Sequence, residues 1–154
     1  MRVAVGADHR GFPYKSPMLA ALAADGHDVI DLGTTSTAAV DYPDFARAVG
    51  EAVRDGRADA GVLICGSGAG VAIAANKLRG VRAALCHDLF TARQAREDDD
   101  ANVICLGSNV VTVEQALALA RTFVAARFSH AERHERRLAK VLALEASECG
   151  RGGR

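Results

Sequence analysis

The stretch that decides the fold is AGVLICGSGAGV, residues 60–71. Its first six residues are all apolar, which is typical of a central parallel strand that is covered on both faces. Three glycines follow within five residues, at positions 66, 68 and 70, and the run VAIAANKL continues with the small residues of a helix. A strand that leads through a glycine loop into a helix indicates one unit of an α/β fold.

The rest of the chain repeats this alternation of strand and helix. The patterns predict strands at residues 2–6, 27–32, 81–86 and 102–106, and helices at 13–25, 44–55, 89–97, 113–127 and 132–146. We therefore expect right-handed βαβ units in a doubly wound, mostly parallel sheet of about five strands, which is a three-layer αβα sandwich. Residues 1–154 should form one domain, with a frayed tail from about residue 147.

Composition and charge exclude several classes of protein. The 154 residues are 49% hydrophobic and 25% charged, and 19 Lys and Arg balance 19 Asp and Glu. Zero net charge gives no electrostatic reason to expect a nucleic acid or an anionic membrane as partner. No apolar run reaches the roughly 18 residues of a membrane span, and the N-terminus lacks a signal-peptide pattern. Four cysteines without C-x-x-C spacing argue against zinc, and reduced thiols suit a cytoplasmic protein.

Polar residues follow four of the five predicted strands, the first, third, fourth and fifth, at the edge of the sheet where a ligand site is expected. These residues are Asp8 and His9, Ser67 in the glycine loop, His87 and Asp88, and Ser108 and Asn109. The carboxyl ends of parallel strands share one edge of the sheet, and α/β proteins bind ligands there.

The glycine loop is the strongest local signal of a binding site. Glycines let the backbone approach a ligand, and a following helix directs free N–H groups at an anion. The spacing is not the dinucleotide fingerprint G-x-G-x-x-G, and no G-K-[ST] of an ATP-binding loop follows. We favour a cradle for an anion or oxyanion over a tight turn that needs glycine for packing.

Cys65 lies at the mouth of this loop. A thiol at a helix N-terminus can act as a nucleophile or a base, although a cysteine that ends a strand is more often a small buried hydrophobe. The neighbouring glycines and Ser67 favour the chemical role. For Cys86 and Cys105 we expect only burial.

Three further groups have both a functional and a plain interpretation. We expect Asp8 and His9 to contact a ligand rather than only form a turn, and to lie beside the glycine loop if the first and third strands are neighbours. Arg133 and Arg137 are spaced i, i+4, so they could bind a phosphate together, or form a solvated face. Residues 97–100, EDDD, are interpreted as a solvated loop at a helix end.

Five motifs together carry a resemblance to a known family. They are GADHRG (6–11), VDYPDF (40–45), CGSGAGVAIAANK (65–77), GVRAAL (80–85) and RHERR (133–137). In this order and spacing they resemble the ribose-5-phosphate isomerase B and galactose-6-phosphate isomerase family, from residue 1 to about 145. The resemblance implies a Rossmann-like fold, a homodimer or tetramer with a site shared between subunits, no metal or other cofactor, and interconversion of aldose and ketose phosphates.

The resemblance also implies a role for each matching residue. Cys65 would be the base that moves a proton between C1 and C2, and Ser67 would hold the enediolate. The remaining residues would bind substrate: the amides of Gly66, Gly68 and Gly70 would cradle the enediolate, Asp8 would orient sugar hydroxyls, Tyr42 would shape the site, and His9, Arg133 and Arg137 would reach the phosphate. The segments around residues 98 and 133 would serve the partner's site.

Three positions depart from the family pattern. Asp98 stands where the family has the histidine that opens the cyclic sugar, and Asp99 stands where it has asparagine. Asn109 replaces an arginine that binds phosphate. We place Asp98 in the catalytic set and Asp99 and Asn109 among the substrate contacts, with Arg10 and Arg136 as candidate compensating cations.

The leading hypothesis for function is interconversion of D-ribose 5-phosphate and D-ribulose 5-phosphate through an enediolate, with Cys65 as base. One alternative is an isomerase of the same family that acts on an unphosphorylated sugar or on an open-chain sugar phosphate. A second is a sugar-binding protein without catalysis, against which the retained Cys65 and Ser67 argue.

Overall fold

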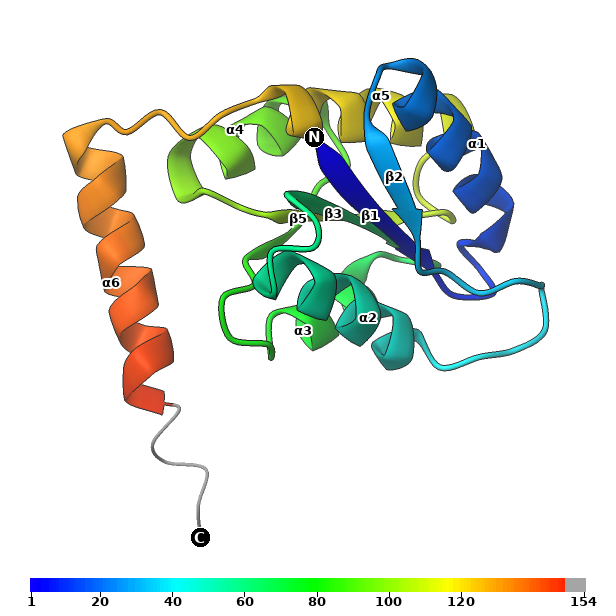
Figure 1. Ribbon diagram of the computed structural model, residues 1–154, viewed down its shortest axis with the longest axis horizontal. Helices are drawn as coiled ribbons and strands as arrows, with labels where there is room; N and C mark the ends of the chain where they lie inside the picture. The colour runs from blue at the N-terminus through cyan, green and yellow to red at the C-terminus, as the bar shows by residue number, and fades with distance from the viewer. Residues whose placement is uncertain (149–154) are drawn as a thin grey trace, which may run out of the picture.

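Five parallel strands form a single sheet in the order β2-β1-β3-β5-β4 in a computed structural model that describes residues 1–148 (Figure 1). The strands are β1 (Arg2–Ala7), β2 (Asp28–Asp31), β3 (Ala60–Cys65), β4 (Ala83–Leu85) and β5 (Val103–Gly107). Every residue of β3 is buried, as its unbroken apolar run predicts for a central strand. The predicted fold class, a parallel αβα sandwich, is confirmed.

Helices cover both faces of the sheet (Figure 1). They are α1 (Phe12–Ala24), α2 (Tyr42–Arg54), α3 (Ala69–Ala75), α4 (Leu89–Asp99), α5 (Val113–Ala125) and α6 (Glu132–Glu148). α1, α4 and α5 pack on one face, and α2 and α3 pack on the other. The chain leaves β1 for β2 on one side and returns to β3 on the other, so the sheet switches direction between β1 and β3. Doubly wound sheets bind their ligands at such a point.

The two faces of β3 divide the hydrophobic core. Val62 and Ile64 join the cluster under α1 and α5, whereas Leu63 and Cys65 join the cluster under α2 and α3. Complete burial of a Val, Leu or Ile side chain contributes about 1.5–3 kcal/mol, so the register of β3 is strongly specified. Cys65 is thereby held on the side of the sheet that α2 and α3 cover.

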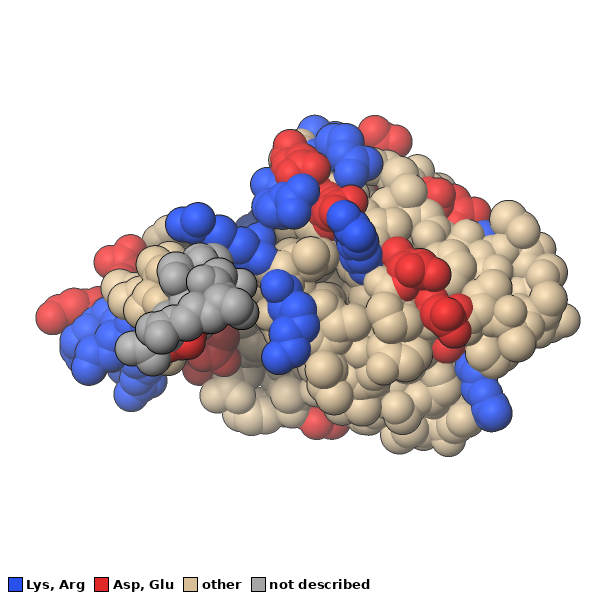
Figure 2. All heavy atoms as spheres, turned by 90° about the horizontal axis from the view of Figure 1, so that it is seen from below, with Lys and Arg blue, Asp and Glu red and all other residues tan. Residues whose placement is uncertain are grey.

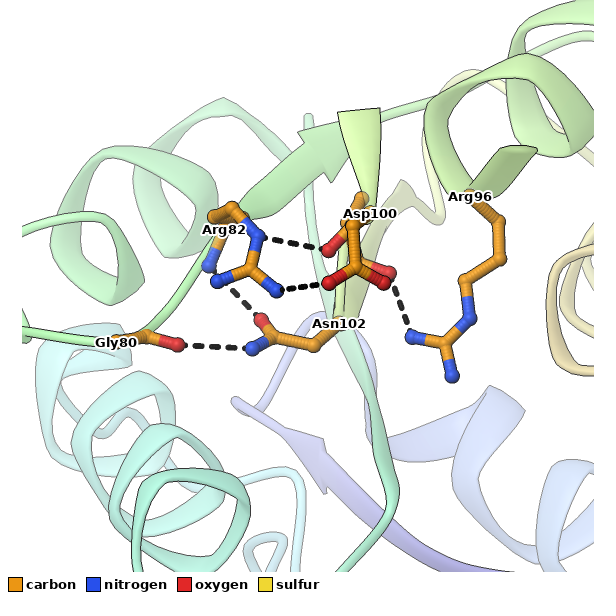
Figure 3. Close-up of polar contacts among 6 residues, drawn as sticks. Gly80, Arg82, Arg96, Asp100 and Asn102 are labelled. Carbon is orange, nitrogen blue, oxygen red and sulfur yellow. Dashed lines mark hydrogen bonds and ion pairs between the residues drawn. The ribbon is translucent and has the colours of Figure 1, made fainter. Parts of the chain in front are cut away.

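The end of α4 corrects one prediction from the sequence. Residues 97–100 were expected to form a solvated loop, but Glu97–Asp99 continue α4 and only Asp100 ends it, with a left-handed φ of 49°. The strong local charge favoured a loop, whereas a distant arginine fixes the helix end. Arg82 donates from Nε to the Asp100 carbonyl and from a guanidinium nitrogen to its carboxylate, each over 2.7 Å (Figure 3).

The same network joins the end of α4 to the start of β4 and β5. Asn102 accepts from the Arg82 backbone N–H and donates to the Gly80 carbonyl, both at 2.8 Å (Figure 3). Arg96 donates to the Ala101 carbonyl at 2.6 Å, and burial lowers the pKa of its guanidinium. This corner of the sheet is therefore held by side chains in place of a longer β4.

α6 projects away from the three layers (Figure 1). A groove of about 650 Å³ separates it from the body, and its wall includes Val81, Arg82, Asp99, Arg137, Leu138 and Val141. α6 extends two residues further than predicted; the rest of the expected tail, residues 149–154, lies outside the described residues. On the side seen in Figure 2, charges of both signs gather toward α6 and a broad area elsewhere is uncharged. No helix within residues 1–148 is long and apolar enough to cross a membrane.

Candidate active site

The loop after β3 places a backbone N–H group beside the Cys65 sulfur. The Gly68 N–H donates to Cys65 Sγ at 3.1 Å, and the Ala69 N–H donates to Ser67 Oγ at 3.2 Å. Gly68 has φ +77°, and a Cβ there would lie 2.8 Å from the Leu106 carbonyl carbon, so both its conformation and its space require glycine. An N–H directed at sulfur stabilises negative charge on a thiolate.

The other cysteines within residues 1–148 differ from Cys65 in their surroundings. Cys86 and Cys105 are fully buried, which confirms the plain interpretation of both. Burial raises the pKa of the Cys86 thiol to about 11 and also raises the pKa of the Cys105 thiol. Neither can act as a base near neutral pH, whereas Cys65, 4% exposed, has the directed N–H of Gly68 beside it.

Asp8 and His9 lie next to this loop because β1 and β3 are neighbours, as predicted. Asp8 is 5% exposed, and one of its oxygens accepts the N–H groups of Arg10 and Gly11, each at 2.9 Å. His9 accepts the Val40 N–H at Nδ1 over 3.2 Å, so its other ring nitrogen carries the proton in the neutral ring. Asp8 thus holds the turn, and the turn presents His9.

Asn109 and Arg10 flank the glycine loop from the end of β5 and the end of β1. A Cβ at Gly66 would lie 3.2 Å from Asn109 Nδ2 and 3.3 Å from Arg10 Cδ. Ser108 ties these segments together, because its hydroxyl donates to the Arg10 carbonyl at 2.9 Å. The Arg10 guanidinium has no ion pair or hydrogen bond within residues 1–148.

Tyr42, at the start of α2, packs against the glycine loop. Its ring lies 3.0 Å from the position that a Cβ would take at Gly70, and the residue is 40% exposed. The structure therefore brings together, at the carboxyl edge of the sheet, Asp8, His9, Arg10, Tyr42, Cys65, Gly66, Ser67, Gly68, Gly70 and Asn109.

The remaining predicted site residues form a second group at the opposite edge of the sheet. α4 begins at the carboxyl edge and ends where β5 begins, so Asp98 and Asp99 lie at the amino edge. Eleven helical residues span about 16 Å, which separates them from the first group. Asp99 and Arg137 line the same groove, and Arg133 is exposed in the first turn of α6. One chain does not bring the two groups together.

His134, which sequence reasoning passed over, connects the two elements of the second group. It is 5% exposed, and its Nδ1 lies 2.7 Å from Ser129 Oγ and 3.4 Å from Asp98 Oδ1. The predicted role of the RHERR motif rests on its arginines, and nothing in the motif signals that the histidine is the buried residue. His87, one of the polar residues that follow the strands, accepts the Gly107 N–H at Nε2 over 3.0 Å.

A family model describing the ribose/galactose isomerases matches residues 3–141. The chain belongs to this family. Within the ribose/galactose isomerases it is 40% identical over 144 residues to ribose-5-phosphate isomerase B of Escherichia coli, with 94% of this chain and 96% of the relative covered. It is 42% identical over 139 residues to the ribose-5-phosphate isomerase B of Mycolicibacterium paratuberculosis, with 90% and 87% covered.

Solved structures of ribose/galactose isomerases agree with the fold. The ribose-5-phosphate isomerase B of Clostridium thermocellum superposes with a TM-score of 0.93 at 42% identity, covering 96% of this chain and 99% of that one. The enzyme from Mycoplasma genitalium, solved with bound ribulose-5-phosphate, gives a TM-score of 0.88 at 39% identity, covering 94% and 96%.

No group of three or more His, Cys, Asp or Glu side chains within the described part of this family member is arranged to hold a metal ion.

Proposed function

We propose that this protein is an aldose–ketose isomerase that interconverts D-ribose 5-phosphate and D-ribulose 5-phosphate, with Cys65 as the base. The observation that carries the proposal is the Gly68 N–H donating to Cys65 Sγ at 3.1 Å inside a loop of glycines. The relatives named ribose-5-phosphate isomerase B support the substrate. The direct test is turnover of ribose 5-phosphate by the wild type and by Cys65→Ala.

The proposed reaction moves one proton between two carbons. The Cys65 thiolate takes the proton from C2 of the open-chain aldose, and the electron pair of the broken C–H bond moves to form an enediolate. The same thiol returns the proton to C1, which gives the ketose once the hydroxyl proton has moved from O2 to O1. A positioned base and a preorganised anion site are the two requirements of such a step.

The loop supplies donors for the developing oxyanion. The backbone N–H groups of Gly66, Ser67 and Gly70 donate to no other group within residues 1–148, so they are available to a ligand. The Ser67 hydroxyl adds a side-chain donor at an exposed position. Preorganised donors of this kind lower the free energy of the enediolate without reorganisation at the moment of reaction.

We infer that the complete site contains residues of two chains. The first group lies at the carboxyl edge of the sheet and the second at the amino edge, so Arg133 and Arg137 would reach the substrate of a partner. Exposed apolar side chains near the first group support a homodimer, because Ile73 is 63%, Leu89 52%, Phe90 74% and Val110 55% exposed.

Arg10 is our candidate for the cation that the family arginine supplies elsewhere. Its guanidinium has no partner within the described residues, and its side chain lies beside Gly66 together with Asn109. With His9 on the same turn, it would offer positive charge to a phosphate despite Asn109. We also infer a reducing compartment, the cytoplasm, since Cys65, Cys86 and Cys105 are all free thiols.

A second candidate function is isomerisation of an open-chain or unphosphorylated sugar by the same loop. Asn109 favours it, because a neutral amide occupies the position beside Gly66 where a phosphate-binding cation is expected. Relative rates with ribose 5-phosphate, ribose and an open-chain aldose phosphate distinguish the two.

A further inference from the structure

The His87 side chain accepts a backbone hydrogen bond from β5 just beyond the end of β4. The last paired residues of β4 and β5 are Leu85 and Cys105, whereas β5 continues to Gly107. The Gly107 N–H donates to His87 Nε2 at 3.0 Å. An imidazole nitrogen therefore occupies the position that a carbonyl of a longer β4 would hold.

This hydrogen bond defines the state of the ring. An imidazole nitrogen accepts a hydrogen bond only with a free lone pair, so His87 must be neutral with its proton on Nδ1. Protonation would turn Nε2 into a donor and leave the buried Gly107 N–H without an acceptor. His87 is partly exposed, so its ring can exchange protons with solvent.

The groups around this end of the sheet set the charge that the ring meets. Asp88 follows His87 and caps α4, and hydrogen bonds from Thr91 lower the pKa of its carboxyl. The titratable groups that β3, the end of β4 and β5 contribute here are the thiols of Cys65, Cys86 and Cys105.

Gly107 is in direct contact with the loop that holds Cys65. It is the register partner of Cys65 in the β3–β5 pair. A Cβ at Gly107 would lie 2.6 Å from the backbone carbonyl of Ser67, and a Cβ at Gly68 would lie 3.1 Å from the Gly107 nitrogen. The Gly107 peptide is therefore closely packed against the backbone of Ser67 and Gly68, and the Gly68 N–H donates to Cys65 Sγ.

We propose that neutral His87 is a positioning residue for the Cys65 loop. By accepting the Gly107 N–H, it fixes the backbone against which Ser67 and Gly68 pack, and so keeps the Gly68 N–H directed at the sulfur. His87 acts through Gly107 and does not contact the reacting atoms. The inference rests on the proposed function, in which Cys65 is the base.

Two substitutions separate this role from simple structural support. In His87→Gln the amide oxygen can accept the Gly107 N–H but cannot titrate, whereas His87→Leu has similar bulk and no acceptor. His27→Gln is a matched control, because His27 lies in the turn before β2, at the amino edge of the sheet. All variants are compared by kcat, KM, thermal midpoint and the NMR amide signals of Gly68 and Gly107.

We expect His87→Leu to lower kcat about tenfold or more, with KM within about twofold, since one buried donor loses its acceptor. His87→Gln should recover most of the loss, and His27→Gln should match the wild type. In His87→Leu the amide signals of Gly68 and Gly107 should both move from their wild-type positions. In His87→Gln both should stay close to the wild-type positions.

Wild-type kcat in folded His87→Leu would overturn the proposal, as would a His87→Gln variant no better than His87→Leu. An unchanged Gly68 signal in His87→Leu would overturn it independently of any turnover. If the wild type isomerises no sugar, the proposed function fails, and the two amide signals still decide whether His87 orders the loop.

Discussion

Asp98 Oδ1 lies 3.4 Å from Nδ1 of His134, a ring whose side chain is only 6% exposed. The carboxylate at position 98 is therefore directed at a buried imidazole on α6. It joins the end of α4 to the start of α6, the two elements that carry the second group of site residues. Asp99 lines the same groove as Arg137, so the carboxylates of Asp98 and Asp99 place two negative charges in this second group.

The double substitution Asp98→His with Asp99→Asn should raise kcat/KM for ribose 5-phosphate about threefold to tenfold. It removes two negative charges from the group that contains Arg133 and Arg137, and attraction of a phosphate dianion grows accordingly. A histidine at 98 also supplies an acid and base for opening the sugar ring. Initial rates with ribose 5-phosphate measure the effect.

Erythrose 4-phosphate is the control substrate, since its phosphate occupies the oxygen that would close the ring. The gain should be smaller with it than with ribose 5-phosphate. An efficient wild type and an unimproved double variant would show that the carboxylates are compensated locally, with Arg10 and Arg136 as the next residues to change.

Asn109→Arg should lower the KM for ribose 5-phosphate about tenfold to a hundredfold. A charge-assisted hydrogen bond to phosphate contributes roughly 1.5–3 kcal/mol, and the side chain at 109 lies beside the glycine loop. Steady-state kinetics with ribose 5-phosphate and with unphosphorylated ribose test this. Equal improvement for both sugars would contradict a phosphate contact at this position.

Mixing two inactive variants should restore activity if the site is shared. Cys65→Ala removes the base of the first group, and Arg137→Ala removes a cation of the second. In a randomly mixed homodimer about half of the molecules are heterodimers with one intact site, which gives about a quarter of wild-type activity. Each variant is unfolded and refolded alone as a control.

No recovery in a mixture that forms heterodimers would show that Cys65 and Arg137 serve the same chain's site or no common site. Sedimentation of the active wild type as a monomer would contradict the shared site directly.

Alkaline pH should destabilise the fold through Cys86. Burial raises the pKa of this thiol in the folded state to about 11, above its unfolded value. Its contribution is therefore present below about pH 9 and is lost as the pH rises toward 11. Two pKa units correspond to about 2.7 kcal/mol at most.

Urea unfolding at pH 8, 9, 10 and 11 checks this expectation. Cys86→Ala has a cavity and starts from a lower free energy of unfolding, but its stability should decline less steeply over the same range. Parallel declines in the two proteins would rule out Cys86 as the cause.

The sequence predicted the carboxyl edge of the sheet well because the signals there are local. The apolar run of β3 begins and ends at the predicted residues, 60 and 65, and Asp8 and Asn109 come to the glycine loop simply by following neighbouring strands. Parallel strands leave no other place for the residues that follow them.

The end of α4 and the burial of His134 could not be predicted in the same way. The charges of Asp98 and Asp99 favour a loop, but Arg82, eighteen positions before Asp100, fixes the helix end through hydrogen bonds to Asp100. The ring of His134 is buried, and its Nδ1 has Ser129 and Asp98 as polar partners. The contacts of Arg82 with Asp100 and of Asp98 with His134 join residues far apart in the sequence, and periodicity carries no information about them.

The most direct test of the central claim is deuterium exchange in ²H₂O, followed by NMR on ribose 5-phosphate with wild-type protein and Cys65→Ala. The wild type should introduce deuterium at C1 of the ribulose 5-phosphate formed and at C2 of the recovered ribose 5-phosphate. Cys65→Ala should unfold at nearly the same temperature and show no exchange at either carbon. Exchange by Cys65→Ala within tenfold of the wild-type rate would contradict the assignment of Cys65 as the base.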